Sequence, residues 1–147
     1  VLAGDGPLKD SLMDFVRQND LNSNVEYIGT IKGKEKTDFF ESLNAFVLPC
    51  IQLENDMDGL PVVFMEAIAC GLPLITTNIS GIPEICINEY NGYLIEERNV
   101  KELVHSMISI AEHKEKRNRF SQNSLKLSDS YNIQNNSKEK LKQLNWI

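Results

Sequence analysis

Residues 58–66 place two carboxylates on either side of the point where an apolar helix is expected to begin. Asp58 and Gly59 precede Pro61, and Glu66 is the acidic residue within the apolar run 62–70. Proline suits the first position of a helix, and the free N–H groups of a first helical turn form an anion site. Carboxylates accept hydrogen bonds from hydroxyl groups. This spacing therefore predicts a site for a phosphate with hydroxyl-rich groups beside it.

Glu66 is the anomaly of this stretch, because a helix that is apolar on every side is expected to be buried. A buried glutamate needs a partner. Helical side chains lean toward the N-terminus, so a residue about one and a half turns into the helix can reach the loop before it. A second interpretation stays open here, in which Glu66 pairs with a core Lys or Arg or with a buried backbone N–H.

The elements that must position these residues follow from the alternation of short apolar runs with helical patterns. Residues 1–3 resemble the end of a buried strand, strands are predicted at 25–28, 45–48 and 73–76, and helices at 8–16, 34–43, 61–69 and 103–111. Such alternation predicts an α/β, Rossmann-like fold, in which a parallel sheet carries helices on both faces. Ligands of these sheets bind at the carboxyl ends of the strands.

The chain as a whole is expected to form a single domain over residues 1–147. Residues 1–113 form the predicted βα core. Residues 114–147 are rich in Lys, Asn, Ser and Gln without a strand pattern, so we expect amphipathic C-terminal helices there. Because the sequence starts in mid-strand at Val1, we also expect that a segment precedes it.

Composition and charge exclude several classes of protein. The chain has 147 residues, 41% of them hydrophobic, and a net charge of −6, which argues against a general nucleic-acid binder. Residues 1–100 carry a net −10 and residues 101–147 a net +4. The basic region is interpreted as solvated helix faces, with an anionic membrane surface as the alternative. Three cysteines without a C-x-x-C pair argue against disulfides and zinc and favour a reducing cytoplasm.

Several motifs in order resemble glycosyltransferase family 4, the retaining enzymes of the GT-B fold. The segment Asp58-Gly59-Leu60-Pro61-Val62-Val63-Phe64-Met65-Glu66-Ala67 resembles the family's carboxylate-x7-Glu motif. Its first acid is often Glu, so Asp58 shortens the reach by one methylene. Ala3–Pro7 is similar to the strand-end glycine turn, and similarity continues through 25–29, 70–75, 81–84 and 91–95. The resemblance covers about residues 2–131 and identifies the chain as the C-terminal, donor-binding half.

The resemblance implies a role for each matching residue. Glu66 is similar to the glutamate that holds the nucleotide ribose, and Asp58 to the acid near the hydroxyls of the donor sugar; these two are the expected catalytic residues. Backbone N–H groups near Gly59 would face the phosphate or sugar, and Ile31 would lie near the base. The expected donor-binding set is Gly4, Gly6, Ile31, Asp58, Gly59, Leu60, Pro61, Val62 and Glu66. For Gly4 and Gly6, a plain tight turn stays an alternative.

The resemblance also implies the substrates and partners. The donor is a nucleotide-diphosphate sugar, the acceptor is a glycan or a lipid-linked precursor, and neither a metal nor another cofactor is expected. A basic phosphate-binding pair and the acceptor site would come from residues upstream of Val1, including an N-terminal domain. We therefore expect the isolated chain to be inactive, and the whole enzyme to be cytoplasmic with peripheral contact at the inner face of a membrane.

Four other functions compete with this interpretation. An NAD-type dehydrogenase is disfavoured because Lys9 stands where the third glycine of G-x-G-x-x-G should be. A nucleotide-sugar epimerase or a phosphorylase would share the fold, since fold does not fix chemistry. A non-catalytic interaction module that keeps the fold is the alternative from a different class.

Overall fold

The strands and helices fall into two compact units, residues 1–39 and residues 40–147, which are described separately. The computed structural model describes residues 1–52 and 59–131. All strand pairs in this part of the chain are parallel, as the sequence predicts. Their hydrogen bonds form two sheets rather than the single sheet expected, one of two strands and one of three, because each unit pairs its own strands.

The first unit holds the smaller sheet and two helical segments. Strand β1 (Leu2–Ala3) pairs with β2 (Tyr27–Gly29), helix α1 (Lys9–Gln18) connects them, and α2 (Gly33–Ser42) begins in this unit. Val16 of α1 is buried. The expectation that residues 1–3 form a buried strand is wrong, since all three are exposed. The physical reason is that β1 has a single paired neighbour, β2, in its sheet.

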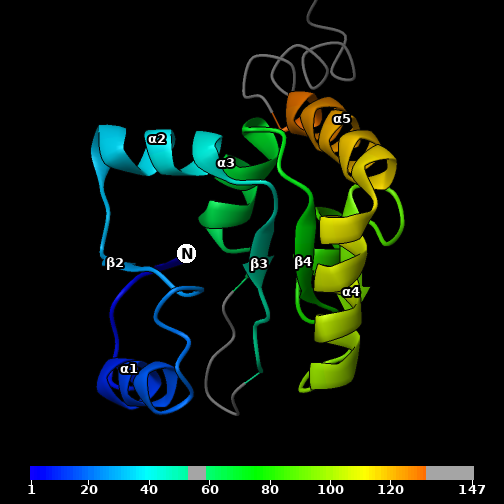
Figure 1. Ribbon diagram of the computed structural model, residues 1–147. Coiled ribbons are helices and arrows are strands. Elements are labelled where there is room, and N and C mark those ends of the chain that lie inside the picture. Colours follow the sequence, from blue (N-terminus) through cyan, green and yellow to red (C-terminus); the bar gives the residue numbers. More distant parts are fainter. Residues whose placement is uncertain (53–58, 132–147) are drawn as a thin grey trace, which may run out of the picture. The chain divides into compact units, whose positions relative to one another are not determined.

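The second unit is built around the strands β3 (Phe46–Leu48), β4 (Leu74–Thr77) and β5 (Gly92–Ile95). Strands β3 and β4 lie side by side (Figure 1), and β5 pairs with the other edge of β4, so the order is β3-β4-β5. Helix α3 (Val62–Ala69) and the short 3-10 helix η1 (Ile82–Glu84) connect them, and α4 (Val100–Glu112) and α5 (Lys114–Ser130) follow. The predicted strands and helices are confirmed with small shifts in their ends.

Alternate residues of this sheet enter two different cores, one on each face. Leu74 packs with Phe64 of α3, whereas its neighbour Ile75 packs with Ile110 of α4 and Phe120 of α5. Successive side chains of a strand point to opposite faces, so a strand that is apolar at every position serves both cores. The prediction of helices on both faces is thus confirmed for this unit, and α3 and α4 lie on opposite sides of β4 (Figure 1).

Helix α5 packs across the edge of the sheet at which β4 and β5 begin. Ser124 donates a hydrogen bond to the carbonyl of Leu72 just before β4 (2.8 Å), and Asn123 donates to the carbonyl of Tyr90 just before β5 (2.8 Å). Burying these carbonyls without partners would be costly. The predicted C-terminal helix is therefore a structural part of the unit, at the edge of the sheet opposite the carboxyl ends.

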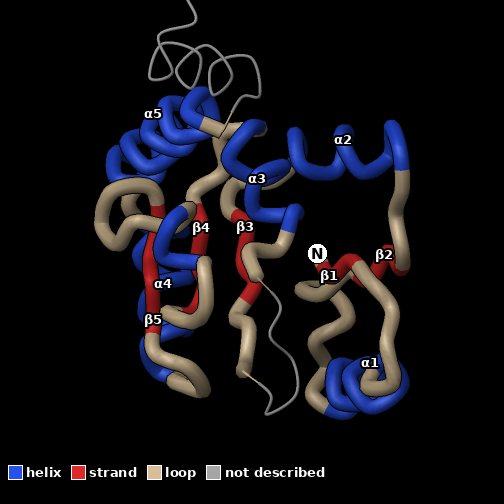
Figure 2. The backbone as a smooth tube through the Cα atoms, turned by 180° about the vertical axis from the view of Figure 1, so that it is seen from behind, coloured by secondary structure: helices blue, strands red, loops and turns tan. Residues whose placement is uncertain are grey.

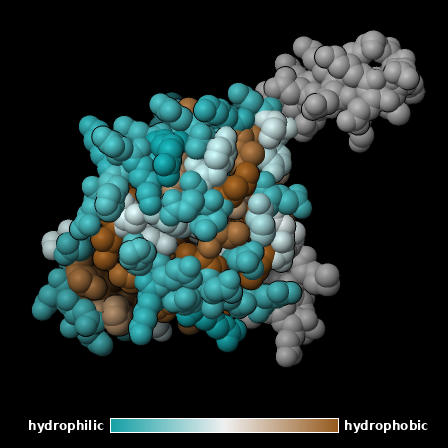
Figure 3. Space-filling view, turned by 90° about the vertical axis from the view of Figure 1, so that its right-hand side faces the viewer, coloured by the Kyte–Doolittle hydropathy of each residue, from teal (hydrophilic) through white to brown (hydrophobic). Residues whose placement is uncertain are grey.

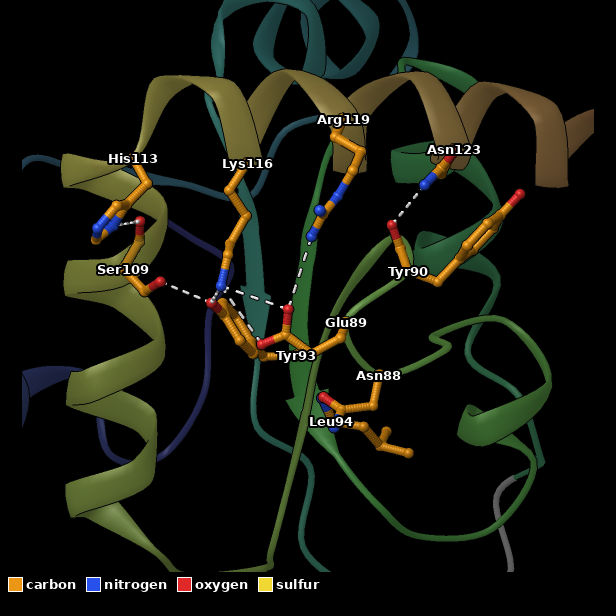
Figure 4. Close-up of polar contacts among 10 residues, drawn as sticks. All are labelled: Asn88, Glu89, Tyr90, Tyr93, Leu94, Ser109, His113, Lys116, Arg119 and Asn123. Carbon is orange, nitrogen blue, oxygen red and sulfur yellow. Dashed lines mark hydrogen bonds and ion pairs between the residues drawn. The ribbon is translucent and has the colours of Figure 1, made fainter.

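A polar network joins α5 to β5 and α4 (Figure 4). Lys116 donates to the hydroxyl of Tyr93 at 2.9 Å, and that hydroxyl also shares a hydrogen bond with Ser109 at 2.6 Å. Lys116 and Arg119 approach the carboxylate of Glu89, at 3.4 Å and 3.8 Å. The hydrogen bond to Tyr93, chiefly, raises the pKa of Lys116. Because these groups hold one another, we interpret the network as structural.

Helix α4 carries a second apolar face that the described residues leave exposed. Val100 is 68% exposed, and Val104, Met107 and Ile108 are also exposed. Apolar side chains gather among polar ones on this side of the molecule (Figure 3). A hollow of about 330 Å³ lies beside the helix, lined by Asn44, Ala45, Val47, Ile75, Met107, Ile110, Ala111 and Arg117. None of these residues belongs to the predicted site. Within the described residues, no helix is both long and apolar enough to cross a bilayer.

Candidate functional site

The carboxyl ends of β3, β4 and β5 point the same way, and the loops that leave them lie at one edge of the sheet (Figure 2). The loop after β3 leads to α3, the loop after β4 leads to η1, and the loop after β5 leads to α4. This is the edge at which parallel α/β sheets bind their ligands. The site is therefore described from the residues of these loops.

The beginning of α3 lies at this edge. A Cβ placed on Gly81, in the loop after β4, would lie 3.7 Å from the backbone nitrogen of Leu60, so the residue before Pro61 lies close to the loop after β4. Pro61 is the residue before the helix rather than its predicted first residue, because its ψ of 129° is extended. Its ring has no hydrogen-bonding group, so it provides no side-chain cap. The N–H groups at the start of α3 consequently face the loop region.

Glu66 lies on the second turn of α3 and is half-buried. Its Oε2 atom is shielded from solvent. The prediction that the whole helix is buried is wrong, since Val62 is 67% exposed. The face with Phe64, Ala67 and Ile68 packs into the core, and a short helix that packs on one side leaves its other side outside. Glu66 thus sits between the core and the surface of its helix.

The C-terminal end of α3 is held by a Schellman motif, which fixes the direction of the helix. Gly71 has a φ of +71°, its N–H donates to Ile68, and the N–H of Leu72 donates to Ala67. A Cβ on Gly71 would also come within 3.1 Å of Leu125 on α5. The prediction that Gly71 ends the helix is confirmed. The helix that carries Glu66 is therefore anchored at the end opposite the site.

The loop after β3 is held by polar side chains that the sequence analysis did not single out. The hydroxyls of Thr76 and Thr77 donate to the carbonyls of Leu48 (2.9 Å) and Cys50 (2.7 Å). The backbone N–H of Gln52 donates to the carboxylate of Glu97 at 3.1 Å. Hydroxyls at the end of a strand that begins with apolar residues, and an acid two residues after a strand, are the signals that could have pointed to these residues.

The thiols of the second unit are not activated. Burial raises the pKa of Cys86 to about 12 and also raises the pKa of Cys50. Burial raises the pKa of Cys70 as well, and the carboxylates of Glu41 and Glu66 add to this effect. A raised pKa keeps a thiol protonated and weakly nucleophilic. Among the described residues, no cluster of His, Cys, Asp and Glu is arranged to hold a metal ion.

The predicted site residues are distributed over different parts of the structure. Gly59, Leu60, Pro61, Val62 and Glu66 come together at the start of α3 in the second unit. Asp58 lies outside the described residues. Gly4, Gly6 and Ile31 belong to the first unit. There Gly4 has a φ of +128° and its N–H donates to Gly29, so this glycine is required for a turn.

Comparison with known proteins connects this geometry to a family. The family "Glycosyl transferases group 1" matches residues 1–127. The chain belongs to this family. It is 30% identical over 130 residues to an uncharacterized glycosyltransferase of Methanocaldococcus jannaschii, which is 88% of this chain and 35% of that protein. It is also 30% identical to the putative colanic acid biosynthesis glycosyltransferase WcaL of Escherichia coli, over 76% of this chain and 28% of that protein.

A solved structure shows the same fold. The Anabaena protein Alr3699/HepE, in complex with UDP-glucose, superimposes with a TM-score of 0.79 over 99% of this chain and 40% of that chain, at 16% identity. The α/β fold predicted from the sequence and the resemblance to GT-B glycosyltransferases are thereby confirmed. The chain spans about a third of the length of the curated relatives named above.

Proposed function

We propose that this chain forms the donor-binding part of a retaining glycosyltransferase of the family 4 type. The observation that carries the proposal is the start of α3 at the carboxyl edge of a parallel sheet, with Glu66 on the second turn of the same helix. A helix start attracts a phosphate through its free N–H groups and its dipole. The carboxylate of Glu66 is an acceptor for ribose hydroxyls.

The resemblance to family 4 suggests a role for each proposed residue of the site. The N–H groups of Gly59, Leu60 and Val62 bind the diphosphate or the sugar, while Pro61, which has no N–H, shapes the turn. Asp58 accepts hydrogen bonds from the sugar hydroxyls. By the same resemblance, Gly4, Gly6 and Ile31 of the first unit are proposed as further donor-binding residues, with Ile31 assigned to the base. Binding requires neither a metal nor another cofactor in this proposal, because backbone dipoles and basic groups neutralise the phosphates.

The proposal extends to the whole protein. Its donor is a nucleotide-diphosphate sugar, as suggested by the UDP-glucose complex of the similar Anabaena protein. Its acceptor is a glycan or a lipid-linked precursor of a polysaccharide, as suggested by the colanic acid protein among the relatives. An N-terminal domain supplies the acceptor site and a basic pair for the phosphates. The enzyme works in the cytoplasm, in peripheral contact with the inner face of a membrane.

An NMR titration of the chain with UDP, GDP and ADP tests the donor-binding role. The amide signals of Gly59 to Val63 should shift on addition of one nucleotide at millimolar concentration, on the order of the affinity of weak exposed sites. Shifts confined to other parts of the chain would contradict the proposal. Retention is tested with the full-length protein, by proton NMR of the first-formed product, whose anomeric coupling should match that of the donor.

A further inference from the structure

Glu97 reaches across the carboxyl edge of the sheet from the loop after β5 to the loop after β3. Its Oε1 atom accepts a hydrogen bond from the backbone N–H of Gln52 at 3.1 Å. Because the strand order is β3-β4-β5, this side chain spans the exit of β4 that lies between the two loops. A hydrogen bond to an ionised acceptor is about twice as strong as one between neutral groups. Glu97 therefore ties together two loops that are 45 residues apart in the sequence.

The turn that carries Glu97 is held rigid by the start of α4. Asn99 caps this helix by accepting from the N–H of Glu102 at 3.1 Å, and the carboxylate of Glu102 accepts in return from Asn99 (3.0 Å) and from the N–H of Glu96 (3.1 Å). This reciprocal arrangement is a variant of the capping box. The backbone on both sides of Glu97 is thereby fixed before any ligand binds.

The same turn contains a backbone conformation that side chains rarely adopt. Arg98 has a φ of +62° and makes an ion pair with Glu97 at 3.5 Å between Nε and Oε1. A non-glycine residue in this region costs free energy and persists when its surroundings require it. The side chain of Glu97 is 29% exposed, so its carboxylate is partly shielded. A strained, capped turn that presents one carboxylate to a distant backbone N–H is a preorganised arrangement.

We propose that Glu97 is a positioning residue that fixes the backbone of residues 50–52 at the carboxyl edge of the sheet, and thereby sets the affinity for the donor at this edge. Thr77 holds Cys50 and Glu97 holds Gln52, so the backbone of residues 50–52 is fixed beside the carboxyl ends of β4 and β5. Leu60, just before α3, lies close to Gly81 at the same edge, since a Cβ added to Gly81 would be 3.7 Å from it. The proposal rests on the donor-binding function proposed above. Glu97 acts through the backbone of residues 50–52, without touching the donor.

The test compares Glu97→Ala and Glu97→Gln with the unchanged 147-residue chain, and Glu96→Ala serves as the control on the same turn. Amide hydrogen exchange reports the Gln52 N–H, and NMR titration with UDP, GDP and ADP reports affinity. We expect Glu97→Ala to speed the exchange of Gln52 about tenfold and to weaken nucleotide binding about threefold to tenfold. Glu97→Gln keeps an acceptor oxygen, so it should retain most of the protection of the Gln52 N–H and most of the nucleotide affinity. Glu96→Ala should change neither the exchange of Gln52 nor the nucleotide affinity, because Glu96 contacts Glu102 through its backbone N–H, which the substitution keeps.

The outcomes separate the two proposals. If the unchanged chain binds a nucleotide at the start of α3 and Glu97→Ala binds it equally well, the positioning role is overturned while the proposed function stands. If Gln52 exchanges at the same rate in Glu97→Ala and in the unchanged chain, the contact itself is absent in solution and the inference fails. If the unchanged chain binds none of the three nucleotides at concentrations up to about 10 mM, its affinity is far weaker than that of a micromolar site. The donor-binding function then fails, and the positioning role fails with it.

Discussion

At the scale of single residues, Glu66 carries the proposed chemistry. It lies half-buried on the second turn of α3. Burial raises the pKa of Cys70 just after this helix, and the carboxylates of Glu41 and Glu66 add to the effect. Two interpretations of such a carboxylate remain distinct: a group that holds the donor's ribose and a group that serves the core. They differ in what a change from Glu to Gln does, because the amide keeps the size but loses the charge.

We expect Glu66→Gln in the full-length protein to lower donor affinity or turnover about tenfold or more. A hydrogen bond to a charged group contributes about 1.5–3 kcal/mol, and this contribution appears in kcat/KM. The melting temperature should stay nearly constant. Steady-state kinetics with the donor and a thermal melt measure the two effects. Unchanged kinetics together with a lower melting temperature would favour the core role instead.

Gly92 is a residue whose importance the sequence did not reveal. The pair Asn91-Gly92 is typical of a turn, yet Gly92 is the first residue of β5 and Asn91 is fully buried. The amide of Asn91 accepts from the N–H of Ile87 at 2.8 Å and donates to the carbonyl of Ile85 at 2.9 Å. A sequence shows which residues favour turns, but it does not show how closely another strand approaches the backbone.

We expect Gly92→Ala to destabilise the second unit by about 1–3 kcal/mol or more. A Cβ at this position would lie 2.1 Å from the backbone oxygen of Leu74, so the strands β4 and β5 would have to move apart. Chemical denaturation followed by circular dichroism measures the loss. Gly59→Ala is the matched control for stability, because no atom of the described residues lies within 4 Å of a Cβ there. Equal stability of the two variants would contradict the close approach.

At the scale of elements, the polar network on α5 joins three elements through one hydroxyl. Tyr93 of β5 contacts Lys116 of α5 and Ser109 of α4. The aromatic ring of Tyr93 also packs on Phe120, with centroids 5.5 Å apart. Polar contacts of this kind select one orientation of a helix on a sheet, whereas apolar packing tolerates several.

We expect Lys116→Met and Tyr93→Phe to be coupled by about 1 kcal/mol in a double-mutant cycle, the size of one hydrogen bond. Because the pKa of Lys116 is raised in the folded chain, its contribution is fully present below its ordinary pKa of 10.5 and is lost as pH rises through the folded value. The stability difference between the unchanged chain and Lys116→Met should therefore shrink above pH 10.5. Additive effects of the two substitutions would show that the contact contributes nothing.

Periodicity and turn residues were sufficient to place most elements. Strand β3 is apolar at every position and β4 begins with two apolar residues, which is typical of strands covered on both faces, and Gly71 marks the end of α3. Composition gave wrong predictions of burial where burial depends on which elements pack nearby. The apolar residues of α3 and of β1 suggested full burial, but Val62 is exposed because α3 packs on one side, and Leu2 is exposed in a sheet of two strands. The contacts made by Thr77 and Glu97 join distant loops, and no local pattern predicts such pairings.

At the scale of the whole molecule, two properties limit what the chain can do alone: its charge, and the share of its relatives' length that it matches. Residues 1–100 hold 16 acidic and 6 basic side chains, an unfavourable field for a diphosphate. At the carboxyl edge of the second unit, Arg98 is already paired with Glu97. The relatives named above are about three times as long as the matched segment. Under the proposed function, the remaining length supplies positive charge and the acceptor.

The last prediction is that the 147-residue chain alone transfers no sugar and binds its nucleotide weakly. Holding donor and acceptor together can supply about 7–11 kcal/mol of a reaction barrier, and in our proposal the acceptor site lies outside this chain. An exposed helix start such as that of α3 contributes about 1 kcal/mol to the binding of a phosphate. We therefore expect a Kd near or above the millimolar range, which corresponds to a binding free energy of about 4 kcal/mol. Calorimetric titration with UDP, GDP and ADP measures this affinity, and a donor-consumption assay measures turnover. Micromolar binding of any of the three would show that the start of α3 and its neighbouring loops form a self-sufficient site, because the positive charge proposed to come from the rest of the protein would then not be needed.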